Sequence, residues 1–349
     1  MHMSIFLLLT LLPQDAPTQA PNISDEEALT IVDATPFGLE RNKPYLLAPA
    51  GSLGSGLIMD ASEFTIHLSF TDRSFEGLRD GTERVSAATI LDTWTTTVVD
   101  ARRSSLNLEA RYGFNDVITL SAGIPLERRE ASWSDGSNGG VTSNEGLGDI
   151  ALGSEMRVLE TESSRLTAGI GVIAPSGEHD AAGPWAGQAD VLLPYGLQLG
   201  GGAWQGTAQA SWILRRGTYA LGIGALTTLP LNKNDAGWAR ERSLQVDAWI
   251  AKGFWDNWVM SLRAQASGFS DVRGDAAGLD PFQNPLEDNG RVGGDRIDLY
   301  GGLSVDLTPQ DGVGSNRLEI ALGLPVYEDL DGPGLAADFS LRLGWRLGF

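Results

Sequence analysis

The amino-acid sequence predicts an all-β protein: a transmembrane antiparallel β-barrel of about twelve strands. Two observations predict this class. Apolar side chains recur at every second position in many stretches along the chain, and the connections between these stretches alternate between short and long. Successive residues of a strand point to opposite faces, so a two-residue alternation indicates a strand with one apolar face. A strand of about 9–11 residues crosses a bilayer when it is tilted.

The last stretch, Leu335–Phe349, shows the alternation most clearly. Every second residue from Ala337 to Phe349 is apolar, and the residues between them are polar or glycine. An exposed apolar edge strand of this kind would promote aggregation in water. A bilayer accommodates it, since barrel strands carry an apolar outer face with aromatic residues near their ends. Taken alone, this segment is also compatible with a strand of a soluble β-sandwich.

Eleven further stretches are predicted to be strands. With the last one, the expected strands are 64–70, 106–112, 118–126, 150–158, 166–174, 203–214, 218–229, 244–251, 258–268, 297–307, 318–326 and 335–349. The short connections between them are 113–116, 160–164, 215–217, 252–257 and 308–316. The long connections are 71–103, 127–147, 175–202, 230–243, 269–296 and 327–334. Outer-membrane barrels have short periplasmic turns and longer extracellular loops, whereas a sandwich has no reason to alternate in this way.

The composition excludes several other classes of protein. The chain has 349 residues, a net charge of −20 and no cysteine, so disulfides and thiolate metal sites are absent. Its acidic balance disfavours nucleic acid as a partner, because nucleic-acid binding needs basic patches. No stretch reaches the roughly 18–20 apolar residues of a membrane helix.

The N-terminus predicts export. Ile5–Leu12 is a short apolar core followed by small residues, as in a secretory signal peptide. We therefore expect three parts: a signal peptide at 1–20, a periplasmic or lumenal segment at 21–61 and the outer-membrane barrel at 62–349. The middle part has no clean periodicity, apart from a possible short helix at Ser24–Val32. It is the candidate for a plug that narrows the lumen, with the loop Gly177–Gly202 as the rival.

The alternation also predicts which side chains face the lumen. Charged residues occupy the non-apolar phase of the strands, because a basic group in the bilayer midplane costs about 2–4 kcal/mol. The terminal Phe349 is the expected signal for the barrel-assembly machinery. The residues expected to line the lumen or pore are Glu109, Arg111, Glu155, Arg157, Asp247, Arg263, Asp298, Glu319, Arg342 and Arg346.

Residues for catalysis or metal binding are sparse. Of the three histidines, only His67 lies near a possible nucleophile, Ser69, and this pair lacks the His-x-Ser-Asn-Gly run of outer-membrane phospholipases. The preferred interpretation of His67 is a polar lumenal side chain. Paired histidines at metal-ligand spacing are also missing. We therefore expect no enzymatic activity, no metal site and no cofactor. The acidic loops, such as Asp271–Asp295, could bind Ca²⁺, but solvated loops are preferred.

Several blocks of sequence resemble a known family. Arg111–Pro125, Gly146–Ile150, Ala174–Glu178 and Leu199–Trp204 occur in this order. Together they resemble the outer-membrane barrels often labelled transporters of phenol-degradation meta pathways. A sister group of barrels is also similar and carries an element like Arg41–Pro44. The resemblance implies a barrel fold and a location in the outer membrane of a Gram-negative-type bacterium.

Two functions are expected from these observations. The first is an outer-membrane channel or transporter for small molecules, and the resemblance points to hydrophobic or aromatic ones. The alternative is a structural or surface barrel with a closed lumen and no transport. The expected partners are outer-membrane lipid, the barrel-assembly machinery and a small-molecule solute.

Overall fold

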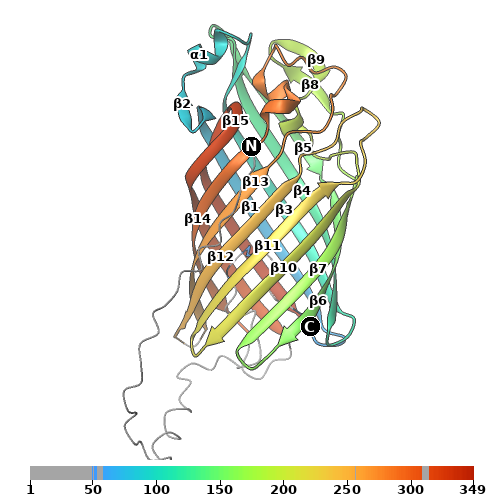
Figure 1. Cartoon of the computed structure of the whole chain (residues 1–349), viewed down its shortest axis with the longest axis vertical. Coiled ribbons are helices and arrows are strands. Elements are labelled where there is room, and N and C mark those ends of the chain that lie inside the picture. The colour runs from blue at the N-terminus through green and yellow to red at the C-terminus, as the bar shows by residue number, and fades with distance from the viewer. Residues whose placement is uncertain (1–48, 50, 53–57, 256, 309–313) are drawn as a thin grey trace, which may run out of the picture. The chain divides into compact units, whose positions relative to one another are not determined.

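The structure is a computed structural model that describes residues 49, 51–52, 58–255, 257–308 and 314–349. In these residues antiparallel strands close into a barrel (Figure 1). The expected signal peptide and the expected helix at Ser24–Val32 lie outside the described residues. The strands of the barrel wall are β1 (Phe64–Gly81), β3 (Thr97–Gly113), β4 (Ile118–Ser134), β6 (Ile150–Glu160), β7 (Ser164–Ala174), β10 (Gln205–Arg216), β11 (Tyr219–Pro230), β12 (Ser243–Phe254), β13 (Trp258–Phe269), β14 (Gly294–Asp306) and β15 (Ser315–Gly348).

The last strand crosses the barrel wall twice and closes it. The first half of β15 pairs with β14, from Arg317 opposite Asp306 to Leu330 opposite Gly294. Its second half returns and pairs with β1, ending with Gly348 opposite Thr65. Ten single strands and this double pass therefore make twelve crossings, which confirms the predicted fold class.

The end of the chain completes the seam between first and last strand. The amide of Phe349 donates a hydrogen bond to the carbonyl of Phe64 at 2.8 Å, and the Phe64 amide donates back at 3.3 Å. The two phenyl rings lie 6.3 Å apart. The aromatic end of the chain therefore packs at the seam, on the outer surface of the barrel.

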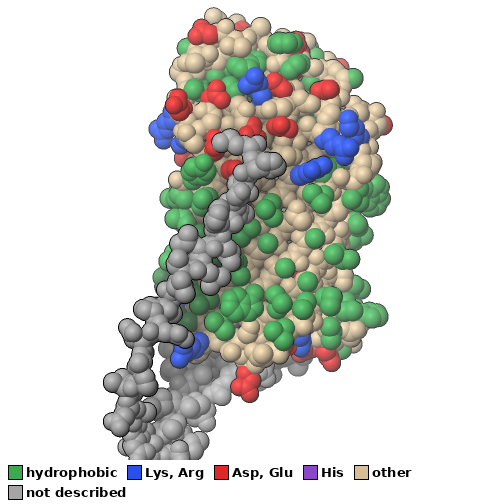
Figure 2. Space-filling model, viewed as in Figure 1, with side chains coloured by type: hydrophobic (Ala, Val, Ile, Leu, Met, Phe, Trp, Pro, Cys, Tyr) green, Lys and Arg blue, Asp and Glu red, His purple; other side chains and the backbone are tan. Residues whose placement is uncertain are grey.

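The outer surface of the barrel is apolar. Leu322 in β15 is 48% exposed, whereas Glu319 in the same strand is 6% exposed. Figure 2 shows apolar side chains across the visible strands and charged side chains gathered toward the two ends. An apolar belt of this extent is unstable in water but suits lipid. The exposed apolar residues of the belt include Leu108, Ile124, Leu152, Ile170, Trp212, Ile223, Ile250, Leu262, Leu299, Leu322 and Leu343.

Several strands are longer than the sequence predicts. β1 continues to Gly81 instead of ending near residue 70, and β3 begins at Thr97. The expected loop 127–147 consists largely of the end of β4 and its partner β5 (Gly139–Leu147). These extensions lie beyond the apolar belt, where neither strand face meets lipid. They therefore lack the apolar alternation, although the backbone pairing continues.

The long connections fold into a compact structure at one end of the barrel, which we call the loop end. The opposite end, with the short connections, is the turn end. The loop end contains β2 (Glu83–Val85), α1 (Ala87–Leu91), the hairpin of β8 (Ala182–Trp185) and β9 (Gln188–Leu192), and the short 3₁₀ helices η2 (Tyr195–Leu197), η3 (Pro285–Glu287) and η4 (Asn289–Arg291). Among the described residues, no helix is long and apolar enough to cross a membrane.

Two apolar clusters hold the loop end together. Trp185, Leu193 and Leu197 pack with Val98 of β3 and Ala131 of β4. A second cluster joins Tyr195 to residues of two other loops, and its members are Tyr195, Trp238, Val272 and Ala276. The segment Gly177–Gly202, which we call the lid, is therefore a folded element and not an open loop.

The assignment of faces can be tested with one added charge. Leu322→Arg places a basic side chain on the lipid face of β15, so we expect it to lower the folding stability by about 2–4 kcal/mol. The measurement is the yield of protein that shows a different gel mobility when unboiled. The matched control is Asn107→Arg, on the inward face of β3, which should assemble normally. Equal losses for both variants would contradict the assignment.

Candidate functional site

The interior of the barrel carries charged side chains in connected groups. At the turn end, Arg111 contacts Glu155 at 3.0 Å and Glu109 at 3.4 Å. Gln209 donates a hydrogen bond to the other Glu155 oxygen at 2.7 Å, and His67 lies 3.8 Å from Glu109. Four strands thus contribute to one network, in which each carboxylate has a positive or donating neighbour. Such pairing offsets the cost of removing these charges from water.

A second group lies further along the lumen. Arg263 is 3.6 Å from Asp247 and stacks over the Tyr300 ring, with 4.3 Å from its guanidinium carbon to the ring centroid. Arg342 lies over the same ring at 4.8 Å. Both arginines donate hydrogen bonds to the carbonyl of Gly51, which precedes the first strand. A backbone segment from before the barrel therefore lies inside it.

Tyr300 can lie against the wall because the neighbouring strand has glycine at position 323. A Cβ atom at that position would come within 2.3 Å of the Tyr300 ring. Any side chain there would push the ring, and the two arginines stacked on it, further into the lumen. The glycine on this inward face therefore makes room for the cation–π group.

One contact of the second group joins two strands that do not pair with each other. Arg73 on β1 donates a hydrogen bond to the Tyr300 hydroxyl at 2.9 Å and lies 3.4 Å from Asp298, both on β14. The two passes of β15 separate β1 from β14 in the wall. The Arg73 side chain therefore spans part of the lumen and narrows it. Arg296, next to it, is 3.1 Å from Asp298.

The remaining predicted residues have separate neighbours. Arg157 forms an ion pair with Glu160, and Glu319 lies 3.0 Å from Arg317. Arg346 stands opposite His67 in the strand register. Ion pairs, hydrogen bonds and ring contacts thus join seven of the ten predicted residues into the two groups. Arg346 and Glu319 lie beside the first group, next to His67, and Arg157 lies apart from both groups. That any of the ten contacts a solute stays a prediction.

The expected segment 21–61 is described only in part. Besides Gly51, the structure describes Ile58 and Met59, and both are buried. The Met59 amide donates a hydrogen bond to the Thr119 hydroxyl of β4 at 2.8 Å. The predicted plug role of the whole segment lies mostly outside the described residues.

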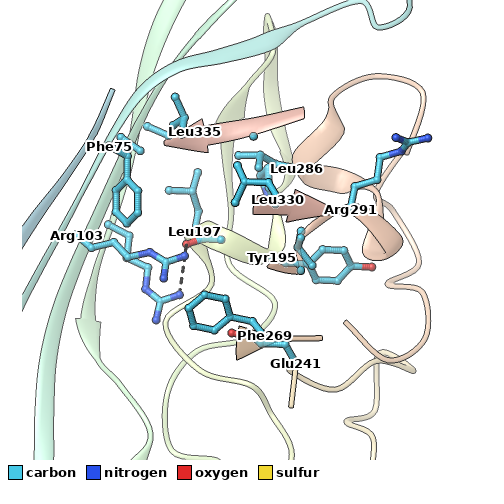
Figure 3. A pocket seen from close by; sticks show the side chains of 18 of the residues that line it. Phe75, Arg103, Tyr195, Leu197, Glu241, Phe269, Leu286, Arg291, Leu330 and Leu335 are labelled. Atoms are coloured by element: carbon cyan, nitrogen blue, oxygen red, sulfur yellow. Dashed lines mark hydrogen bonds between the residues drawn. The ribbon is translucent and has the colours of Figure 1, made fainter. Parts of the chain in front are cut away.

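At the loop end, the barrel and the lid line a chamber with a volume of about 270 Å³ (Figure 3). Its wall includes Arg103 and Phe75 from β3 and β1, and Leu335 from β15. The lid contributes Tyr195 and Leu197. The chamber lies between the lid and the Arg73 contact, so it occupies the entrance to the lumen.

One side of the chamber is strongly basic. Arg103 and Arg129 both donate hydrogen bonds to the lid carbonyl of Gly196, at 3.4 and 3.3 Å. Arg129 and Arg240 share the next acceptor, the carbonyl of Gln198, at 2.6 and 2.9 Å. Shared acceptors hold the three guanidinium groups side by side. They fix the lid, and they concentrate positive charge in a chain whose net charge is −20.

Apolar side chains form much of the rest of the chamber wall. Figure 3 shows Phe75, Leu335, Leu330 and Phe269 around the same space as Arg103. Arg103 lies over the Phe75 ring at 5.9 Å. A guanidinium group next to aromatic faces binds planar anionic groups and tolerates an apolar neighbour. The chamber is therefore amphiphilic.

Hydrogen bonds inside the lid keep it in place over the chamber. The buried Gln198 accepts from the Ala181 amide at 2.9 Å and donates to the carbonyls of Ala181 and Leu193, at 3.1 and 2.8 Å. The Trp185 indole donates to Glu287 of η3 at 2.8 Å. Burial raises the pKa of Glu287 above its ordinary value, since water is excluded from that carboxyl.

Most of the chamber residues were not predicted as site residues, because they lie in segments whose pattern predicts loops. A signal for some of them was present. Arg73 and Phe75 continue the inward phase of His67, and Arg129 continues the inward phase of Gly123. Extending the alternation beyond the apolar stretch would have placed them inside the barrel.

The described residues contain no group of three or more histidine, cysteine, aspartate or glutamate side chains that could hold a metal ion. His67 has Glu109 as its charged neighbour. His179, in the lid, lies 2.8 Å from Asp235, and this hydrogen bond holds the pKa of Asp235 below its ordinary value.

No protein-family model and no curated protein sequence matches the chain. Among solved structures, the chain is similar to an outer-membrane channel from Pseudomonas putida F1, with a TM-score of 0.59 and 14% identity over 85% of this chain and 99% of that one. This likeness shows the fold. Together with the apolar belt, it places the chain in a Gram-negative outer membrane.

More distant likenesses add no argument. The translocator domain of the autotransporter NalP from Neisseria meningitidis has a TM-score of 0.40 and 14% identity, over 82% of this chain and 88% of that one. The CymD monoaromatic hydrocarbon channel has a TM-score of 0.38 and 10% identity, over 83% of this chain and 89% of that one.

The role of Gln198 in holding the lid can be tested by proteolysis. Gln198→Ala leaves buried lid groups without their partners, each at a cost of about 1–3 kcal/mol, so we expect faster cleavage within Gly177–Gly202 of the membrane-embedded protein. The matched control is Gln188→Ala, an exposed position of the same lid, which should be cleaved like the unmodified protein. Equal protection of both variants would show that Gln198 does not hold the lid.

Proposed function

We propose that this protein is an outer-membrane channel that admits small solutes through the chamber at its loop end. The observation that carries the proposal is the chamber itself. It lies inside the barrel, directly under a folded lid, and both basic and apolar side chains line it. Concave sites with a largely apolar wall and a few polar groups are typical of small-molecule binding.

A route from the chamber to the turn end would pass the two charged groups of the lumen. A barrel of eight strands is filled by its side chains, and one of 16–18 strands leaves a water-filled channel. Twelve crossings lie between these cases. Long arginine side chains such as Arg73 and Arg342 occupy the remaining space, and rotation of these side chains would widen it. We propose the ten predicted charged residues as the lining of this route.

The apolar side of the chamber supports a solute with a hydrophobic or aromatic body. Phe75, Phe269 and Leu335 would contact such a body. The solute class expected from the family resemblance therefore agrees with the chemistry of the chamber, and we include it in the proposal.

One observation favours the alternative, a barrel with a closed lumen. The contact between Arg73 and Tyr300 and the hydrogen bonds of Arg263 and Arg342 to Gly51 all narrow the same level of the lumen. A barrel that is permanently closed there would act through its surface alone. Electrical recording separates the two functions.

We expect the purified protein to conduct ions in planar bilayers, and Arg342→Ala to raise the single-channel conductance. The substitution removes the side chain that stacks on Tyr300 and donates to Gly51, so the constriction becomes wider. The measurement is the conductance of single insertions at fixed salt concentration.

The matched control for this experiment is Arg128→Ala. The Arg128 side chain is 56% exposed and pairs with Glu130 at 2.9 Å on the outer face of β4. Its removal should leave the conductance unchanged. Absence of conductance in the unmodified protein and in Arg342→Ala, with normal assembly of both, would support the closed barrel instead.

A further inference from the structure

We infer that the chamber is a binding site for small organic anions, namely carboxylates carried on an aromatic or aliphatic body. This inference rests on the proposed function, because it names the class of solute that the channel would take. It is carried by three observations: guanidinium groups without an ion-pair partner, an apolar wall beside them and the size of the chamber.

The first observation concerns charge. In the part of the chain that the structure describes, Arg73, Arg129 and Arg296 form ion pairs with carboxylates. Arg103 and Arg240 form no ion pair and donate to lid carbonyls, although Glu241 of the chamber wall lies close enough to act on the charge of Arg103. Arg103 is exposed although it lies on the inward face of β3, so the surface that it exposes faces the chamber. A bound carboxylate would give Arg103 and Arg240 the direct ion pair that neighbouring carboxylates of the wall do not form with them.

The second observation concerns the apolar wall next to these arginines. Phe75, Phe269, Leu330 and Leu335 present apolar surface within the same enclosed space. A sugar or inorganic phosphate would leave this surface without a partner and would lose its own hydration. A solute with one anionic end and one apolar end matches both sides of the chamber at once.

The third observation concerns size. The cavity of about 270 Å³ lies just below the range of about 300–1,000 Å³ of ordinary ligand pockets. It therefore suits a molecule with a single ring or a short chain better than an oligosaccharide or a peptide.

The lid gives this site a second property. The carbonyls of Gly196 and Gln198 occupy donors of Arg103, Arg129 and Arg240. An anion forms stronger, charge-assisted hydrogen bonds with guanidinium than a neutral carbonyl does. A bound carboxylate would thus compete with the lid for the same donors and loosen its attachment.

The direct test is binding of benzoate to the purified full-length protein by titration calorimetry. We expect saturable binding, and a loss of affinity of about tenfold in Arg103→Gln, because a hydrogen bond to a charged group is lost. Arg103→Lys should retain part of the affinity, since it keeps the charge but not the bidentate geometry. Arg128→Gln, on the outer face of β4, is the matched control and should bind benzoate normally.

Two comparison solutes isolate the two ends of the ligand. Benzyl alcohol has the ring without the charge, and inorganic phosphate has the charge without the ring, so both should bind at least about tenfold more weakly than benzoate. Binding of phosphate as tight as that of benzoate would overturn the inference in favour of a general anion site. Binding of benzyl alcohol as tight as that of benzoate would overturn it in favour of an apolar site.

Passage is measured separately, as the zero-current potential across a planar bilayer under a gradient of sodium benzoate. Benzoate binding that depends on Arg103, without any benzoate current, would uphold the site and overturn the channel function. Conductance without benzoate binding, or binding unaffected by Arg103→Gln, would overturn the inference and leave the channel function standing.

Discussion

The structure depends on one constraint: within a bilayer, every backbone N–H and C=O group must find a partner inside the protein. The chain meets it by pairing the second half of β15 with β1, which leaves the barrel wall without a free edge. The hydrogen bonds between Phe349 and Phe64 extend the pairing to the last residue. Closure in turn requires each strand to show one face to lipid and the other to the lumen.

The inward face then concentrates charge in a narrow space. With twelve crossings, inward side chains of strands that do not pair with each other come into contact, as Arg73 of β1 and Tyr300 of β14 do. Buried charges are tolerated only where they have partners, and the two networks of the lumen provide them. The same side chains that satisfy this requirement also narrow the route for a solute, so stability and permeation depend on the same groups.

At the loop end, backbone groups can also pair with water, so strand pairing is no longer obligatory. Side-chain hydrogen bonds hold the loops there. The lid is held from within by Gln198 and from the barrel wall by the arginines that donate to Gly196 and Gln198. These arginines have two roles, since they fasten the lid and face the chamber. Because the same arginines hold the lid and face the chamber, a ligand bound in the chamber would affect the position of the lid.

The sequence by itself determined the fold class, about twelve crossings and the face on which the residues of the apolar stretches lie. The bilayer imposes a two-residue alternation that can be recognised in the sequence alone, so Glu319 and Leu322 could be assigned to opposite faces. Only the tertiary structure decided which inward residues meet. Contacts between Arg73 and Tyr300, or between Arg103 and the lid, join positions far apart in the chain and depend on barrel closure. Beyond the apolar belt, no lipid imposes the alternation. The chamber residues could therefore be recognised only from the tertiary structure of the loops.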